Sequence, residues 1–269
     1  MKKDKDYDYL LGSCGALQIV LNLYELTQNR QLLDNAVEFA NKLIENAKYE
    51  DKGTIYWVST QATNALAGLS HGQSGFSLMF ARMGKITKNQ YYINISRKVM
   101  NYEDQFYNTK IGNWSDQRII NGVKNEEKGV NPVAWCHGAT GILLSRIYMY
   151  DCIENNEFRK LVCEDIDNAV QSSIKYGYRN NYCLCHGDFG NIEILREYAI
   201  KFQDKKIEDL CNNLIVSMTK EVINKEWHCG LPNEYENPGF MTGISGIGYS
   251  LLRRYCPQLP NVLALDINY

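Results

Sequence analysis

The sequence has few residues of several kinds, and each scarcity excludes a class of protein. Its 269 residues include only five prolines and four histidines, and 29 basic residues nearly balance 31 acidic ones. This even balance gives no basic surface of the kind that binds nucleic acid, so we expect no nucleic-acid partner. No apolar run approaches the roughly 18 residues that a membrane-spanning helix needs. With 45% hydrophobic residues, the chain can still fill one large core.

Cysteine is abundant by comparison, with nine residues. The number is odd and the chain is much longer than a disulfide-stabilised miniprotein, so a disulfide framework is not expected. Cys152, Cys163 and Cys211 fall within helical patterns, where free thiols pack like small hydrophobic side chains. We therefore predict a reducing compartment, the cytoplasm.

A short glycine pattern occurs five times along the chain. Gly-x-x-Gly pairs recur at spacings of 49 to 66 residues, and an apolar run follows each pair. Amphipathic stretches at 32–47, 93–106, 158–174 and 207–222 separate these runs, with apolar residues at helical spacings. The pairs are Gly12/Gly15, Gly72/Gly75, Gly138/Gly141, Gly187/Gly190 and Gly243/Gly246.

The alternation of fully apolar and amphipathic helices at a regular period predicts an all-α fold. Inner and outer helices would form an α/α arc, either an open solenoid or a toroid. Strand patterns are weak, and no linker divides residues 1–269, which we treat as one domain. The loops at 108–132 and 224–238 are long and rich in aromatic and turn residues, as is typical of functional loops on one rim.

Three of the four histidines directly precede the first glycine of a pair, and two of these follow a cysteine. The histidines are His71, His137 and His186, and the cysteines are Cys136 and Cys185. Equivalent positions of successive repeats would lie on one rim, at the positive ends of helix dipoles that stabilise thiolates. Two thiolates and an imidazole are suitable ligands for a catalytic zinc ion with an open fourth position. The pattern therefore predicts an enzyme.

Two further cysteines near these segments are interpreted as structural. Cys183 could form a Cys-x-Cys pair with Cys185, but on an extended loop it would point to a different side. Cys229 follows His228, yet no Gly-x-x-Gly helix comes directly after this dipeptide. We expect neither cysteine to bind metal.

Four segments carry a resemblance to a known family. They are Gly-Leu-Ser-His-Gly at 68–72, Ala-Trp-Cys-His-Gly-Ala-Thr-Gly-Ile at 134–142, Leu-Cys-His-Gly-Asp-Phe-Gly-Asn-Ile-Glu at 184–193 and Pro-Gly-Phe-Met-Thr-Gly-Ile-Ser-Gly-Ile-Gly-Tyr at 238–249. Together they resemble the lanthionine synthetase C-like cyclases of lanthipeptide biosynthesis, most of all the C-terminal cyclase domain of bifunctional class II synthetases. The resemblance runs from about residue 8 to the C-terminus.

The resemblance implies a reaction and a role for each motif residue. A peptide cysteine thiol would add to dehydroalanine or dehydrobutyrine in the same peptide, giving a lanthionine or methyllanthionine thioether ring. The implied Zn²⁺ ligands are Cys136, Cys185 and His186, with a substrate thiol in the fourth position. The implied acid–base residues are His71, Asp8, which would orient or charge His71, and His137 as a further proton donor.

The same resemblance implies partners and a location. The substrate would be a dehydrated precursor peptide with its leader, and a dehydratase domain or protein and a peptide transporter would be partners. The chain would be cytoplasmic, or peripheral to the membrane through the transporter complex.

Two departures from the family pattern stand out. Nisin-type cyclases carry an arginine shortly before the Trp-Cys pair, whereas this chain has Pro132-Val133-Ala134 there, which supplies no charge. The family toroid has seven repeats and this chain shows five, so we expect an incomplete ring that lacks the first two. Another polypeptide could complete it.

Three other functions are weighed against cyclisation. A homologue that adds glutathione would share the zinc site and use an external thiol. A non-catalytic zinc-containing module would dock the peptide or a dehydratase without turnover. An α/α-toroid glycosidase needs two opposed carboxylates, but the predicted rim offers thiols and imidazoles.

Overall fold

The computed structural model describes residues 5–50, 53–129, 131–178, 181–223, 225–233 and 235–265. Positions 130, 224 and 234 of the two long loops fall outside these ranges. Two sets of helices alternate along the described chain. The inner set is α1 (Ser13–Thr27), α3 (Gln73–Thr87), α5 (Ala139–Tyr150), α7 (Asp188–Phe202) and α9 (Ile244–Tyr255). The outer set is α2 (Arg30–Glu45), α4 (Gln90–Glu103), α6 (Asn156–Tyr176) and α8 (Lys205–Val222).

The remaining elements are short and lie in the loops. Three antiparallel pairs have strands of two residues each, and three turns of 3₁₀ helix accompany them. The pairs are β1 (Lys48–Tyr49) with β2 (Ile55–Tyr56), β3 (Tyr107–Asn108) with β4 (Asn113–Trp114), and β5 (Ile119–Ile120) with β6 (Val123–Lys124). The 3₁₀ turns are η1 (Asp104–Phe106), η2 (Asn125–Lys128) and η3 (Val262–Ala264). The all-α prediction is confirmed.

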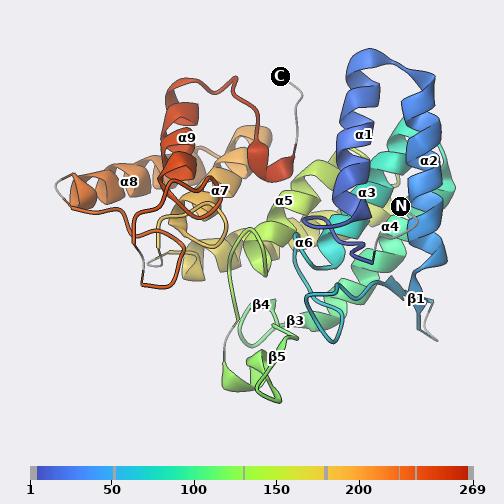
Figure 1. Cartoon of the computed structure of the whole chain (residues 1–269), viewed down its shortest axis with the longest axis horizontal. Coiled ribbons are helices and arrows are strands. Elements are labelled where there is room, and N and C mark those ends of the chain that lie inside the picture. The colour runs from blue at the N-terminus through green and yellow to red at the C-terminus, as the bar shows by residue number, and fades with distance from the viewer. Residues whose placement is uncertain are drawn as a thin grey trace.

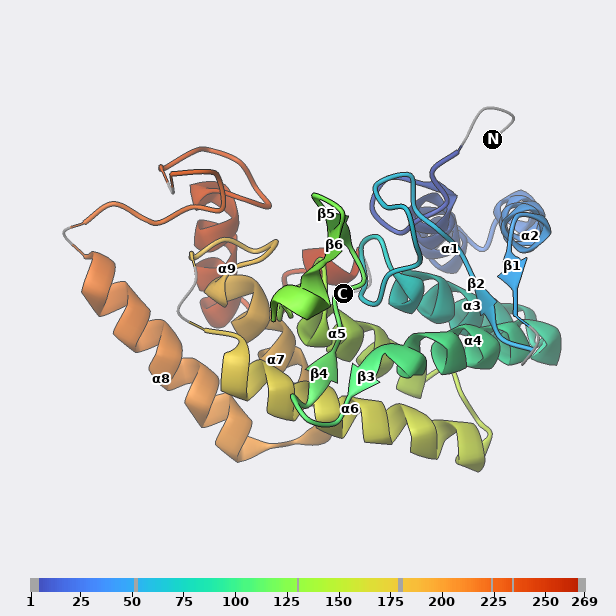
Figure 2. The same ribbon diagram turned by 90° about the horizontal axis from the view of Figure 1, so that it is seen from below.

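The inner helices stand side by side in chain order. Each packs against the next, from α1 through α3, α5 and α7 to α9, and α2, α4, α6 and α8 pack against the inner helices that precede them. Figure 2 shows the result as an arc, with α4, α6 and α8 along its lower border and β4 of the α4–α5 loop against α6. The predicted α/α arrangement is therefore present, with α1 and α9 at its two ends (Figure 1).

The two sets of helices begin differently, for a reason that is visible in their sequences. Each outer helix has an asparagine or aspartate at its N-cap, whose side chain accepts a hydrogen bond from a backbone N–H of the first turn. Each inner helix begins instead at the first glycine of a pair, without a side-chain cap. The loop that precedes each inner helix takes the space that a capping side chain would fill.

The second glycine of each pair lies against the backbone of that loop. A Cβ atom there would come within 1.9 to 2.7 Å of the carbonyl oxygen six residues earlier, too close for any side chain. Among the first glycines only Gly138 has a positive φ, of 85°. Close backbone approach, more than unusual dihedral angles, thus explains the repeated glycines.

The loops that lead into the inner helices, here called the rim turns, are joined by a row of backbone hydrogen bonds. In each turn the residue two positions before the first glycine donates its N–H to the carbonyl oxygen of the equivalent residue in the next turn. The row runs from Leu10 to Ser70 (3.0 Å), from Ser70 to Cys136 (3.4 Å), from Cys136 to Cys185 (3.2 Å) and from Cys185 to Met241 (2.9 Å). Corresponding residues of the five repeats therefore lie in register on one rim.

The C-terminal segment crosses the inside of the arc. The Tyr9 hydroxyl donates to the carbonyl oxygen of Ala264 at 2.7 Å, and the Trp135 indole donates to that of Leu263 at 2.8 Å. On the other side, Asn261 donates to Glu197 of α7 at 2.9 Å. The segment thereby links the two halves of the arc, and Figure 1 shows η3 between α9 and α1.

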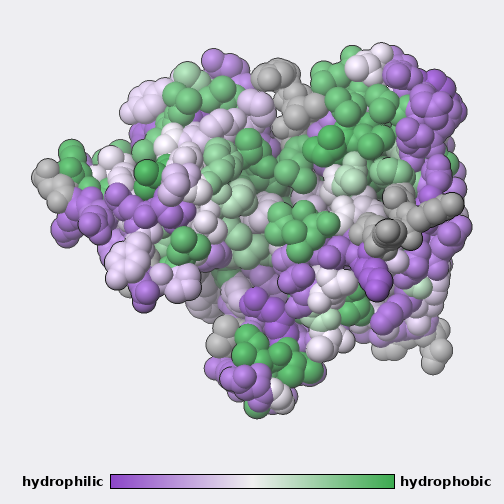
Figure 3. Space-filling view, in the orientation of Figure 1, coloured by the Kyte–Doolittle hydropathy of each residue, from purple (hydrophilic) through white to green (hydrophobic). Residues whose placement is uncertain are grey.

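Both end helices leave apolar side chains uncovered. On α1, Ile19, Leu23 and Leu26 follow a spacing of four and three and are exposed. On α9, Ile244 and Leu252 are exposed. Figure 3 shows hydrophobic residues gathered over α1. Among the described residues, no helix combines the length and the hydropathy that crossing a membrane requires.

Candidate metal centre

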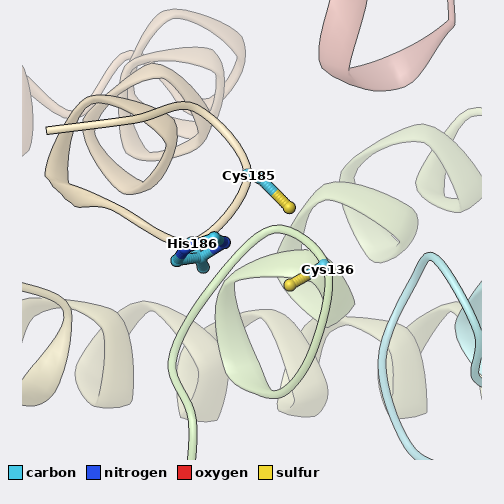
Figure 4. Close-up of side chains that lie close together, drawn as sticks. All are labelled: Cys136, Cys185 and His186. Atoms are coloured by element: carbon cyan, nitrogen blue, oxygen red, sulfur yellow. The ribbon is translucent and has the colours of Figure 1, made fainter. Parts of the chain in front are cut away.

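Two adjacent rim turns bring three potential metal ligands together. One side-chain ligand atom each from Cys136, Cys185 and His186 lies within 4.8 Å of the others, and all three residues are half-buried. Figure 4 shows the two sulfur atoms and the imidazole around a common space, Cys136 from the turn before α5 and the other two from the turn before α7.

The backbone fixes the spacing of the two thiols. The N–H of Cys136 donates to the carbonyl oxygen of Cys185, and the N–H of Cys185 donates in turn to Met241. His186 is held from its other side, because its Nε2 lies 3.1 Å from the carbonyl oxygen of Gly230. This bond assigns the ring proton to Nε2 and leaves Nδ1 as the nitrogen that could bind a metal.

The electrostatics of the two thiols differ. A hydrogen bond from the Cys185 thiol lowers the pKa of Cys136, and the positive charges of Arg118 and His71 act in the same direction. The same hydrogen bond, together with burial, raises the pKa of Cys185. A divalent cation bound by both thiolates would replace this hydrogen bond between the two sulfur atoms.

These residues fit a zinc ion. Tetrahedral zinc with bonds of about 2.3 Å to sulfur and about 2.0 Å to nitrogen places its ligand atoms within about 4 Å of one another. A separation of up to 4.8 Å requires only small side-chain movements. Two thiolates and an imidazole favour zinc over the harder divalent cations, and three protein ligands leave one tetrahedral position for a substrate.

Cys183 and Cys229 lie outside this group. Both are fully buried, and the Cys183 sulfur accepts the backbone N–H of His186 at 3.4 Å. A Cβ atom on Gly230 would lie 2.5 Å from that sulfur, so the Cys183 side chain packs directly against Gly230. All nine cysteines are free thiols.

The turn before α3 places His71 beside Asp8. The His71 Nδ1 lies 2.8 Å from the Asp8 Oδ2, and the Asp8 carboxylate also accepts the Ser59 hydroxyl at 2.6 Å and the Leu11 N–H at 2.8 Å. Burial alone would raise the pKa of Asp8, but these hydrogen bonds hold it below its usual value. A carboxylate that stays ionised fixes the proton on Nδ1 and leaves Nε2 of His71 to exchange a proton. The imidazole side chain is 25% exposed.

His137, the further proton donor that the family resemblance implies, lies beside a buried carboxylate. Its Nε2 lies 3.1 Å from Oδ1 of the fully buried Asp116, within ion-pair distance but without the alignment of a hydrogen bond. Asp116 also binds Arg118, two residues away. Neither residue belongs to a repeated motif, so the sequence did not indicate that they would lie beside His137.

A second residue that the motifs do not reveal supports the turn that carries His71. Glu103, at the end of α4, is fully buried and accepts the N–H groups of Gly68 at 2.8 Å and Ser74 at 3.0 Å. Its other oxygen pairs with the buried Arg146 at 2.7 Å.

An arc of inner and outer helices with a Cys₂His group on its rim defines an α/α-toroid protein with a candidate metal centre. The family model for lanthionine synthetase C-like proteins matches residues 1–267. The chain belongs to this family.

Two relatives illustrate the similarity. The lacticin 481/lactococcin biosynthesis protein LcnDR2 of Lactococcus lactis subsp. lactis is 29% identical over 259 residues, which are 92% of this chain and 25% of that protein. The structure of nisin cyclase matches with a TM-score of 0.70 at 21% identity, over 93% of this chain and 63% of that one. The chain thus spans a quarter of the first relative and less than two thirds of the second, and the toroid fold is shared.

Proposed function

We propose that this chain is a zinc-dependent cyclase that forms lanthionine and methyllanthionine rings in a dehydrated precursor peptide. The Cys136–Cys185–His186 group, beside the Asp8–His71 pair, is the observation that carries the proposal. Family membership supports a lanthipeptide substrate. On this proposal, a dehydratase and a peptide transporter act before and after the chain in the cytoplasm, where free thiols persist.

Zinc held by these three residues would lower the pKa of a substrate thiol in its open position and so supply a thiolate at neutral pH. Residues of the chain itself orient the reacting groups and transfer the proton. The carboxylate of Asp8 holds His71 in one orientation and one tautomer. His71 then donates a proton from Nε2 to the α-carbon after the sulfur has added to the β-carbon. His137, which is 5% exposed, is a candidate for a further donor.

The test uses the whole chain, zinc and a synthetic peptide with one dehydroalanine and one cysteine. We expect about one zinc per chain and loss of alkylatable thiol without a change of peptide mass. Cys136→Ala should lose both zinc and cyclisation, while Cys183→Ala, the matched control, should keep both.

The alternatives give different readouts. Stoichiometric zinc without thiol consumption would show a docking module instead of an enzyme. A peptide that gains the mass of added glutathione, with its own cysteine still alkylatable, would show the glutathione-adding reaction. Metal loss in Cys183→Ala together with retention in Cys136→Ala would refute the ligand assignment.

A further inference from the structure

The loop between α4 and α5 carries an ion pair, Arg118–Asp116, that lies against His137. Asp116, just after β4, is fully buried and accepts hydrogen bonds from several donors. Its Oδ1 accepts the N–H and the Nε of Arg118, both at 3.0 Å, and its Oδ2 accepts Nη2 of Arg118 and Nδ2 of Asn125, both at 2.7 Å. Bidentate pairing of this kind fixes the plane of the guanidinium group.

This ion pair lies between the two turns that carry the chemistry. The Gln117 carbonyl oxygen accepts a hydrogen bond from Asn64, in the loop that leads to His71. Asp116 contacts His137, the neighbour of Cys136. The Arg118–Asp116 ion pair therefore lies against His137, the chain neighbour of the candidate ligand Cys136.

One edge of this guanidinium group makes no hydrogen bond within the described residues. Nε and Nη2 of Arg118 donate to Asp116, whereas Nη1 has no hydrogen-bond partner there. The Arg118 side chain is 39% exposed, so a ligand can reach it. A guanidinium group has five N–H donors and remains charged at any working pH, which makes its free edge a site for an oxygen that carries negative charge.

This inference rests on the proposed function. The geometry points to Arg118 as a catalytic residue that binds the carbonyl oxygen of the acceptor dehydroamino acid. There it would stabilise the enolate that forms when the thiol adds. The sulfur forms a bond to the β-carbon, and the electron pair of the C=C bond moves to the α-carbon and its carbonyl oxygen. The free edge of Arg118 donates to that oxygen. A proton from His71 then forms the C–H bond at the α-carbon. The thiol loses one proton and the α-carbon gains one, so the reaction neither consumes nor releases protons overall.

The experiment compares Arg118→Ala with Lys124→Ala, which removes one positive charge from the same loop. Both variants and the wild type receive zinc and the peptide with one dehydroalanine and one cysteine. For Arg118→Ala we expect full zinc content and a kcat lower by about two orders of magnitude, the effect of losing one oxyanion donor. Affinity for the saturated peptide, with alanine in place of dehydroalanine, should fall far less than kcat, because its carbonyl oxygen never carries the enolate charge. Lys124→Ala should react like the wild type.

Chemical rescue separates catalysis from support of the fold. Added guanidinium ion at millimolar concentration should raise the rate of Arg118→Ala in a concentration-dependent way and leave Lys124→Ala unaffected. An Arg118→Ala variant that cyclises at the wild-type rate, or that loses zinc and is not rescued, would overturn the role of Arg118 alone. A wild-type chain that binds zinc but does not cyclise would overturn the proposed function, and the role of Arg118 with it.

Discussion

His71, the proposed proton donor, lies beside Asp8 and outside the group of candidate metal ligands. Its Nδ1 is committed to the buried carboxylate of Asp8 at 2.8 Å, and it belongs to a different rim turn from all three candidate ligands. Removing the imidazole should therefore leave the metal in place.

We expect His71→Asn to retain its zinc and to form thioether at a rate lower by about two orders of magnitude, the lower end of general acid–base contributions. The measurements are metal content and loss of alkylatable thiol. Ser59→Ala removes a neighbouring hydrogen bond to Asp8 and is the control, with a much smaller effect. Loss of zinc in His71→Asn would make His71 a ligand and contradict the assignment of His186.

The candidate ligands could be predicted from the sequence because each lies within a local motif at a repeated position. Cys136 and Cys185 precede a histidine and a glycine, so the helical period alone places them on one rim. Arg118 could not be predicted in this way. Its position depends on hydrogen bonds to Asp116, in a loop that also contains two short strand pairs. The segment Pro132-Val133-Ala134 carries no charge. On the proposal above, Arg118 of the preceding loop supplies one.

At the scale of the elements, the junction of α4, α5 and α6 gathers several carboxylates around the buried Arg146. Asp104, just after α4, is near Asp165 of α6 and 3.9 Å from the guanidinium group of Arg146. Burial and then the charge of Asp165 raise the pKa of Asp104 to about 8. In the unfolded chain an aspartate titrates near pH 3.9, so the folded chain holds a proton that the unfolded chain releases.

This proton makes stability depend on pH. The contribution of Asp104 is fully present below about pH 4 and is lost as the pH rises through about 8. We therefore expect Asp104→Asn, which stays neutral, to raise the Tm at pH 8.5 and to change it little at pH 4. Thermal unfolding followed by circular dichroism measures both. Asp34→Asn, at an exposed ion pair on α2, is the control. An equal change of Tm at both pH values would contradict the raised pKa of Asp104.

The positions of the helices could be predicted from the sequence. Apolar runs after the glycine pairs became α1, α3, α5, α7 and α9, because residues that are apolar on all sides must be buried. The 3₁₀ turn at Val262–Ala264 could not be anticipated, since its position depends on hydrogen bonds to Tyr9 and Trp135, far away in the sequence.

For the whole molecule, the uncovered faces of α1 and α9 should determine how the chain behaves in solution. Leu23 on α1 and Leu252 on α9 lie at opposite ends of the arc, and contiguous exposed apolar surface favours association. We expect concentration-dependent self-association of the isolated chain.

Sedimentation velocity tests this expectation. Leu23→Glu and Leu252→Glu should shift the population toward monomer with little change in Tm, because neither side chain belongs to the core. Val216→Glu is the matched control, since Val216 on α8 has the same 40% exposure as Leu23 but lies away from both ends. Equal effects of all three variants would show a general effect of charge instead of specific end faces.

The row of hydrogen bonds along the rim limits where such a protein can gain or lose repeats during evolution. The backbone N–H of Cys136 donates to the carbonyl oxygen of Cys185, and the N–H of Ser70 donates to that of Cys136. The position of each rim turn therefore depends on the turn next to it. A duplicated helix pair between α5 and α7 would insert a further rim turn between Cys136 and Cys185 and so separate the two thiols. The same duplication beyond α9 would leave every one of these neighbours in place. Variation in repeat number is therefore tolerated only at the ends of the arc, and the stretch from α1 to α7 must be inherited as one unit.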